Sequence, residues 1–165
     1  MSQLIQLKPF TPEDFKTLIA WIADEGLLTQ FAGPVFTFPL TEEQLHHYLE
    51  DAHRSVFKVV DSTTQCTIGH AEIYNNQHGS VRLCRVLIGD EKFRGKGFGQ
   101  AIIQALISYS LKELHATAIS LNVYAWNLGA IKCYEKVGFV LNADNFTTVK
   151  VGEEVWHSVQ MDWQG

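Results

Sequence analysis

The sequence has few cysteines and no long apolar run. Three cysteines occur among 165 residues, odd in number and far apart: Cys66, Cys84 and Cys133. They fit neither a disulfide framework nor a Cys-x-x-Cys zinc site, which favours a reducing, cytoplasmic location. No stretch approaches the ~18 apolar residues of a membrane-spanning helix, and residues 1–10 lack the apolar block of a signal peptide. We therefore expect no membrane partner.

An excess of positive charge is also absent. The chain has 13 lysines and arginines against 18 aspartates and glutamates, a net charge of −5. This balance argues against a nucleic-acid partner and fits a cationic substrate more easily. The seven histidines show no His-x-x-x-His spacing, so we predict no metal site.

Composition and patterning predict one folded domain spanning residues 1–165. The hydrophobic content of 46% and charged content of 19% are typical of globular proteins, and no repeat, linker or low-complexity tract interrupts the chain. Strand-like patterns occupy residues 4–7, 56–61, 66–74, 80–88, 118–124, 139 onward and 155–161. Helical patterns begin near Thr11, Thr41, the glycines around 97 and Asn127, whereas Gly26–Pro39 reads as an irregular aromatic loop that packs on the core or lines a pocket. This order predicts an α+β fold with one open sheet.

A glycine-rich stretch joins an apolar strand to an amphipathic helix. Its sequence is Arg94-Gly95-Lys96-Gly97-Phe98-Gly99. Glycines let the backbone approach an anion, and the helix start adds free N–H groups and partial positive charge. The stretch therefore predicts a phosphate-binding loop; the alternative is an ordinary loop with glycines for turning.

The spacing of these glycines excludes the two commonest phosphate-binding motifs. A P-loop would need Gly-Lys five residues after a glycine, but Arg94 stands five residues after Gly89, and Lys96 is followed by Gly97. A dinucleotide fingerprint would need a glycine three residues after the second glycine of a Gly-x-Gly pair, but Gln100 and Ile102 occupy those places. The remaining pattern, Arg-x-x-Gly-x-Gly, is a shorter cradle.

Two motifs together resemble the GCN5-related N-acetyltransferase (GNAT) superfamily. Arg94-x-x-Gly97-x-Gly99 is followed by Asn127-x-x-Ala130-x-x-x-Tyr134-x-x-x-Gly138-Phe139. The resemblance covers residues 66–139, and residues 1–52 are loosely similar in layout to the ribosomal-protein N-terminal acetyltransferase branch. It implies a mixed, mostly antiparallel central sheet with helices on both faces and a splayed strand pair forming the cofactor slot.

The resemblance also implies acetyl-coenzyme A (acetyl-CoA) as co-substrate. In that family the cradle amides hold the pyrophosphate, the preceding strand pairs with the pantetheine arm, and the next strand, here residues 118–124, forms the other wall. The cofactor-binding residues so implied are Val86, Leu87, Ile88, Arg94, Gly95, Lys96, Gly97, Phe98, Gly99, Gln100 and Asn127.

Transfer to an amine needs a proton acceptor for the amine and a donor for the departing thiolate. An amine with a pKa near 10.4 is neutral in only ~0.04% of molecules at pH 7. Tyr134 is the candidate acid, with a packed core aromatic as the alternative. Many relatives carry a glutamate where this chain has Leu83 or Asn122. Glu72 is the best remaining carboxylate for catalysis or substrate binding; a paired surface role and water-relayed deprotonation stay open.

The resemblance thus predicts an acetyl-CoA-dependent N-acetyltransferase that works by direct transfer in a ternary complex. A non-catalytic acyl-CoA-binding sensor is the alternative, since the usual glutamates are missing. Protein N-termini, polyamines and aminoglycoside-like amines all remain possible acceptors, and the chain would be a monomer or a homodimer.

Overall fold

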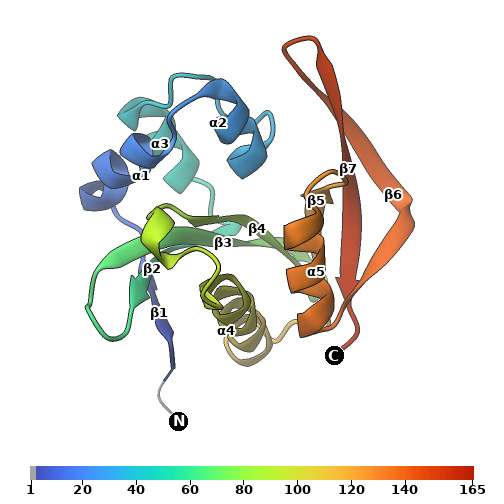
Figure 1. Cartoon of the computed structure of the whole chain (residues 1–165). Helices are drawn as coiled ribbons and strands as arrows, with labels where there is room; N and C mark the ends of the chain where they lie inside the picture. The colour runs from blue at the N-terminus through green and yellow to red at the C-terminus, as the bar shows by residue number, and fades with distance from the viewer. Residues whose placement is uncertain (1–2) are drawn as a thin grey trace.

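The computed structural model describes residues 3–165 and contains one seven-stranded sheet (Figure 1). Its strands are β1 (Ile5–Pro9), β2 (Arg54–Asp61), β3 (Thr67–Gln77), β4 (Ser80–Ile88), β5 (Ala118–Tyr124), β6 (Phe139–Val151) and β7 (Glu154–Trp163). Their order across the sheet is β1-β2-β3-β4-β5-β7-β6. Among the strands of the described residues, only the β4–β5 pair is parallel. The predicted mixed, mostly antiparallel sheet is confirmed.

Helices cover both faces of this sheet, as predicted. Figure 1 shows the first three on one face and the last two on the other. They are α1 (Phe15–Trp21), α2 (Glu25–Ala32), α3 (Glu42–Leu49), α4 (Phe98–Lys112) and α5 (Leu128–Val137), with short 3-10 turns at Pro12–Asp14 and Glu91–Phe93. Within residues 3–165, none of these helices has the length and hydropathy needed to cross a membrane.

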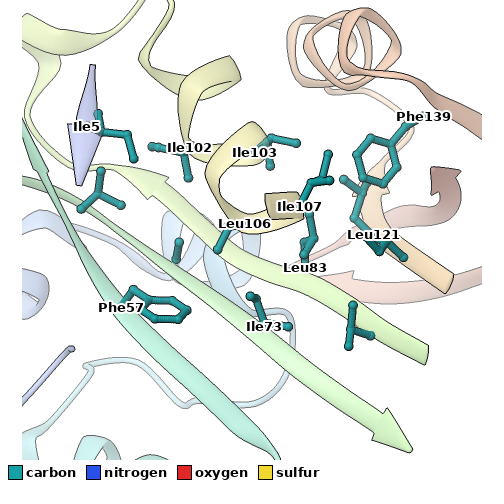
Figure 2. Packing of buried hydrophobic residues seen from close by; sticks show 14 of the residues in the cluster. Ile5, Phe57, Ile73, Leu83, Ile102, Ile103, Leu106, Ile107, Leu121 and Phe139 are labelled. Carbon is teal, nitrogen blue, oxygen red and sulfur yellow. The ribbon is translucent and has the colours of Figure 1, made fainter. Parts of the chain in front are cut away.

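The main core lies between the sheet and α4. Figure 2 shows Ile102, Ile103, Leu106 and Ile107 of α4 packed over sheet residues that include Ile73 and Leu83. Burying a side chain of this size contributes roughly 1.5–3 kcal/mol. Because this packing fixes α4 against β4, it also fixes the loop that joins them.

The segment Gly26–Pro39 differs from the prediction, because its first part is helical. Asp24 caps α2 by accepting a hydrogen bond from the backbone N–H of Leu27 at 2.7 Å. Leu28, Phe31 and Ala32 then form the buried face of the helix. Gly26 and the nearby prolines obscured this spacing, although the aspartate cap was visible in the sequence.

The starts of α3 and α5 and the end of α5 lie where the sequence predicted them. The Thr41 hydroxyl accepts from the N–H of Gln44 at the start of α3, and the Asn127 side chain accepts from the N–H of Ala130 at the start of α5. Gly138 ends α5 in the left-handed conformation, with φ of 112°. Local signals of this kind are readable because cap and helix are adjacent in the chain.

Candidate functional site

A slot opens where β4 and β5 separate. The two strands pair only from Ser80 opposite Ala118 to Leu83 opposite Leu121. Beyond that point Cys84–Leu87 and Asn122–Tyr124 line a cavity of about 380 Å³. The cavity also reaches α2, the loop after it and the β6–β7 hairpin. The predicted splayed strand pair is therefore present.

A hydrogen bond joins β5 to α2 at the edge of the cavity. The Tyr124 hydroxyl of β5 donates a hydrogen bond to the backbone carbonyl of Thr29 in α2, at 3.1 Å. Phe31, Gly33 and Val35 line the cavity from the α2 side. The aromatic segment 26–39 therefore has both of the predicted roles, packing on the core through Phe36 and lining the cavity through other residues.

A β-bulge interrupts β4 beside the slot. His70 lies opposite Leu87 and Glu72 lies opposite Cys84, so Arg85 and Val86 together oppose one residue of β3. Arg85 has a φ of 50°, which is uncommon for a residue with a side chain. Surrounding contacts must hold this conformation, because it costs on the order of 1–3 kcal/mol.

Two contacts clamp Arg85. Its backbone carbonyl accepts a hydrogen bond from Nδ1–H of His70 at 2.8 Å. Its guanidinium Nη1 donates to both carboxylate oxygens of Glu72, each at 3.1 Å. The bulge is therefore fixed through the backbone and the side chain of the same residue.

Glu72 is fully buried and saturated with donors. Besides Arg85, it accepts hydrogen bonds from Nη1 of Arg54 at 2.9 Å, from the Cys84 thiol at 3.3 Å and from the Tyr48 hydroxyl. Burial together with the Glu72 charge raises the pKa of Cys84 to about 12, and the same two causes raise the pKa of Tyr48. Both groups therefore stay protonated as donors to the carboxylate.

These contacts favour a positioning role for Glu72 over proton abstraction. Its oxygens are occupied by charged and neutral donors, and it is not among the residues that line the cavity. The sequence placed Glu72 on the strand beside the slot, which the structure bears out in position. Its predicted part in catalysis stays a prediction, and the paired surface alternative does not hold because the residue is buried.

His70 is a buried neutral residue beside this cluster. Burial lowers its pKa to about 4, so Nδ1 carries the proton given to the Arg85 carbonyl and Nε2 is unprotonated. Nε2 has no hydrogen-bond partner among the described residues, and the rings of Phe10 and Phe31 pack edge-on at 5.0 and 5.1 Å. Of the two roles considered for His70, the structural one fits these surroundings.

The glycine cradle lies at the start of α4. Gly95 and Gly97 have φ of 73° and 85°, and a Cβ at either position would meet no atom within 4 Å. Backbone conformation, not lack of space, therefore calls for glycine here. Gly97 is the N-cap and offers no side chain to the first turn of the helix, where Phe98, Gly99 and Gln100 have no intrahelical partner for their N–H groups.

The side chains of the cradle differ in how far they are available to a ligand. Arg94 is tied to the strand end by a hydrogen bond from Nε to the Ile88 carbonyl at 3.1 Å, and Lys96 is exposed. Phe98 is buried against Phe93, so only its backbone is available to a ligand. Exposed left-handed glycines, two cations and a helix start fit a pyrophosphate group.

The strand before the cradle has one free edge. Leu87 and Ile88 pair with His70 and Gly69 of β3, whereas their other edge faces the slot left by the β4–β5 splay. Val86 and Leu87 line the cavity. An extended arm with amide groups fits this edge, because the strand has unpaired backbone donors and acceptors there.

Tyr134 and Asn127 both line the cavity, from α5 and its cap. Burial raises the pKa of Tyr134 to about 12, so its hydroxyl remains a proton donor at neutral pH. Among residues 3–165, no aspartate, glutamate or histidine lines the cavity. The missing base noted from the sequence is therefore also missing from the cavity wall.

The comparisons with known proteins agree with this geometry. Residues 5–140 match the family model described as "Acetyltransferase (GNAT) domain". The chain belongs to the GNAT acetyltransferase family. A spermine/spermidine N(1)-acetyltransferase of Bacillus subtilis is 34% identical over 70 residues, 42% of this chain and 45% of that protein, so the match spans less than half of the relative.

Two further relatives match over a greater length. An aminoglycoside N(6')-acetyltransferase type 1 of Klebsiella pneumoniae is 26% identical over 148 residues, 82% of this chain and 73% of that protein. The structure of a Vibrio cholerae spermidine N-acetyltransferase, in complex with CoA and spermine, has a TM-score of 0.81 at 22% identity and covers 98% of this chain and 95% of that one. At this identity the structural match establishes the fold alone.

Proposed function

We propose that this chain is an acetyl-CoA-dependent N-acetyltransferase that acts on a small-molecule amine. The observation that carries the proposal is the continuity of the cradle, the free edge of β4 and the β4–β5 slot. A ligand with a pyrophosphate at one end and a thioester on an extended arm would thread these three features in order. Membership of the acetyltransferase family supports the same reading.

The residues of the chain would divide the work as follows. The amides at the start of α4, with Arg94 and Lys96, would bind the pyrophosphate. Backbone N–H groups near Leu87 would stabilise negative charge developing on the thioester oxygen. Tyr134 would protonate the departing thiolate, since its raised pKa keeps the hydroxyl protonated. Acetyl-CoA supplies the activated acetyl group.

Deprotonation of the amine would occur through water. An amine with a pKa near 10.4 must lose a proton before it attacks, and no ordinary base lines the described cavity. Ser158 and Asn122 are polar residues that line the cavity and could order a water relay. Glu72 would act indirectly by holding the Arg85 bulge from which Val86 and Leu87 continue.

The acceptor in this proposal is a polyamine or an aminoglycoside. Relatives named for these two amine classes were found in the comparisons, which supports a small amine over a protein N-terminus. A peptide N-terminus is the second candidate, in line with the loose layout similarity of residues 1–52. The observation in its favour is Arg82, a cation that lines the cavity and would pair with a peptide carboxylate.

Thiol release from acetyl-CoA with a panel of amines tests the proposal. The panel comprises spermidine, spermine, an aminoglycoside and N-terminal peptides with and without an acidic residue. We expect release with the small polyamines or the aminoglycoside. Release with acidic peptides alone would favour the second candidate, and tight acetyl-CoA binding without release for any amine would favour a non-catalytic sensor.

Three further attributes remain proposals. One continuous sheet supports a single domain over residues 1–165. Three free cysteines support a reducing, cytoplasmic location. We propose a monomer or homodimer, although a Vibrio cholerae spermidine N-acetyltransferase is described as dodecameric. Light scattering coupled to size exclusion measures the mass directly and would separate these states.

A further inference from the structure

Two tryptophans form an exposed corner at the edge of the fold. Trp126 follows β5 and is 47% exposed, and Trp156 lies near the start of β7. Their ring centroids are 5.2 Å apart at an interplanar angle of 69°. Together with Glu154 and Val155 they line a shallow pocket, which we call the aromatic corner.

The aromatic corner continues the wall of the catalytic cavity. Ser158 lines the cavity, and Trp156, two residues earlier, projects from the same face of β7. Val149 of β6 also lines the cavity and lies directly opposite Trp156. Tyr124 connects the two places, since it lines the cavity and its ring lies 6.1 Å from Trp126 and 5.1 Å from Trp156.

Charge differs between the two ends of this wall. Arg82 lines the cavity and pairs with Ser120 of β5, which in turn pairs with Asp162 of β7. Trp156 lies six residues before Asp162 along β7, a distance of roughly 20 Å at about 3.3 Å per residue. At the far end Nε1–H of Trp156 donates to the Glu154 carboxylate at 3.1 Å. Glu154 is the one carboxylate among the described residues lining either pocket.

We propose that the aromatic corner binds the distal ammonium of an acceptor that carries two or more amines. This inference rests on the proposed transfer of acetyl to an amine. The reacting amine would enter the slot beside Tyr134, while a second ammonium reaches the face of Trp126 and the carboxylate of Glu154. Tryptophan is the aromatic side chain that attracts cations most strongly, and a carboxylate held in place beside it adds charge pairing.

The proposal predicts selectivity for extended polyamines over monoamines. A monoamine such as n-butylamine would make the reaction contacts without reaching the aromatic corner. Spermidine would occupy both, so its KM would be the lower one. Loss of a single cation–π or charge contact at this exposed site would raise KM for spermidine about 2- to 5-fold.

Substitutions at the aromatic corner test this selectivity. Trp126→Leu and Glu154→Gln should raise KM for spermidine and leave KM for n-butylamine and kcat for both amines unchanged. Glu153→Gln is the matched control, because it removes the same charge from the neighbouring exposed residue. An equal change for both amines in Glu154→Gln, or an equal effect of Glu153→Gln on spermidine, would overturn the proposal.

Two other results keep this inference separate from the proposed function. If the wild-type protein acetylates no amine, the proposed function fails, and calorimetric titration with spermidine and n-butylamine still tests the corner. Preferred binding of spermidine that Glu154→Gln abolishes would support it, and equal binding of both amines would refute it. If Trp126→Leu converts a dimer to a monomer without changing spermidine KM or affinity, the corner is an interface between copies, and the proposal is wrong.

Discussion

The two walls of the cavity between β4 and β5 are built in opposite ways. The β4 wall is fixed by two independent contacts to Arg85: buried Glu72 accepts from its guanidinium, and neutral His70 donates to its backbone carbonyl. The opposite wall, formed by β5 and the β6–β7 hairpin, ends in exposed aromatic and apolar side chains such as Trp126 and Phe146. Figure 1 shows this hairpin extending past the end of β5.

The difference in construction indicates that the two walls have different roles. A strained bulge must be held rigidly if backbone N–H groups are to point at a reacting carbonyl. A wall that binds the acceptor amine needs adaptable contacts. Its apolar and aromatic surface would select amines by their shape and charge, which requires no strained backbone. We infer that the β4 wall serves the donor and the hairpin wall serves the acceptor.

The largest expected effect comes from breaking the β4 wall. Glu72→Gln leaves two arginines, with side chains 16% and 9% exposed, without their common anion. Removing one partner of a buried ion pair costs about 3–5 kcal/mol. We expect the free energy of unfolding, measured with urea, to fall by this amount. Glu154→Gln on the hairpin wall should change it by less than about 0.5 kcal/mol; equal losses would remove the contrast between the walls.

Tyr134→Phe tests the proposed protonation of the departing thiolate in the cavity between the two walls. The variant keeps the ring that packs on Phe139 but loses the proton donor. General acid catalysis is worth roughly 10²–10⁴ in rate, so kcat should fall by that factor while the Kd for acetyl-CoA stays constant. An unchanged kcat would make Tyr134 a packing residue, the alternative that its half-buried position also allows.

Stability should depend on pH through His70. Its pKa is about 4 in the folded protein and near 6.5 when unfolded, so the unfolded chain binds the extra proton between these values. The free energy of unfolding should therefore fall as pH drops from 6.5 to 4, by roughly 3 kcal/mol. Urea titrations at several pH values should show this slope reduced in His70→Gln. If the exposed His47→Gln reduces the slope equally, His70 is not its source.

The smallest effect is expected at the cradle. Gly97→Ala forces a side chain into a left-handed conformation at a cost of roughly 1–2 kcal/mol. Binding of acetyl-CoA, measured by calorimetry, should weaken about 5- to 30-fold, since the loop must keep this conformation for its amides to converge. Gly129→Ala is the control, because Gly129 lies in α5 with open space at Cβ and ordinary φ. Equal affinity of the two variants for acetyl-CoA would argue against pyrophosphate binding by the cradle.

Elements defined by local pattern could be predicted from the sequence. The bounds of β4 and β5 were predicted to the residue, because apolar runs and alternation are local properties. The cradle and the α5 cap were predicted for the same reason. The helix α2 was missed because Gly26 weakens its pattern, although the cap at Asp24 and the spacing of Leu28, Phe31 and Ala32 were sufficient to detect it.

The buried charge cluster could not be predicted in the same way. Glu72 contacts Arg54 of β2 and Arg85 of β4 through the sheet register, and Tyr48 through the packing of α3 on the sheet. The left-handed conformation of Arg85 has no sequence signal, since its side chain disfavours it. The aromatic corner was missed likewise, because Trp126 and Trp156 are thirty residues apart and meet only through the pairing of β5 with β7.

Rapid mixing of the preformed acetyl-CoA complex with spermidine tests the central claim, direct transfer in the slot. The raised pKa of Cys84 and of Cys133 argues against a cysteine that takes the acetyl group first. We predict no thiol release before spermidine is added and a single phase of release afterwards, together with formation of acetylated spermidine. A burst of thiol release before spermidine arrives would contradict direct transfer, and so would the absence of release with both spermidine and an aminoglycoside.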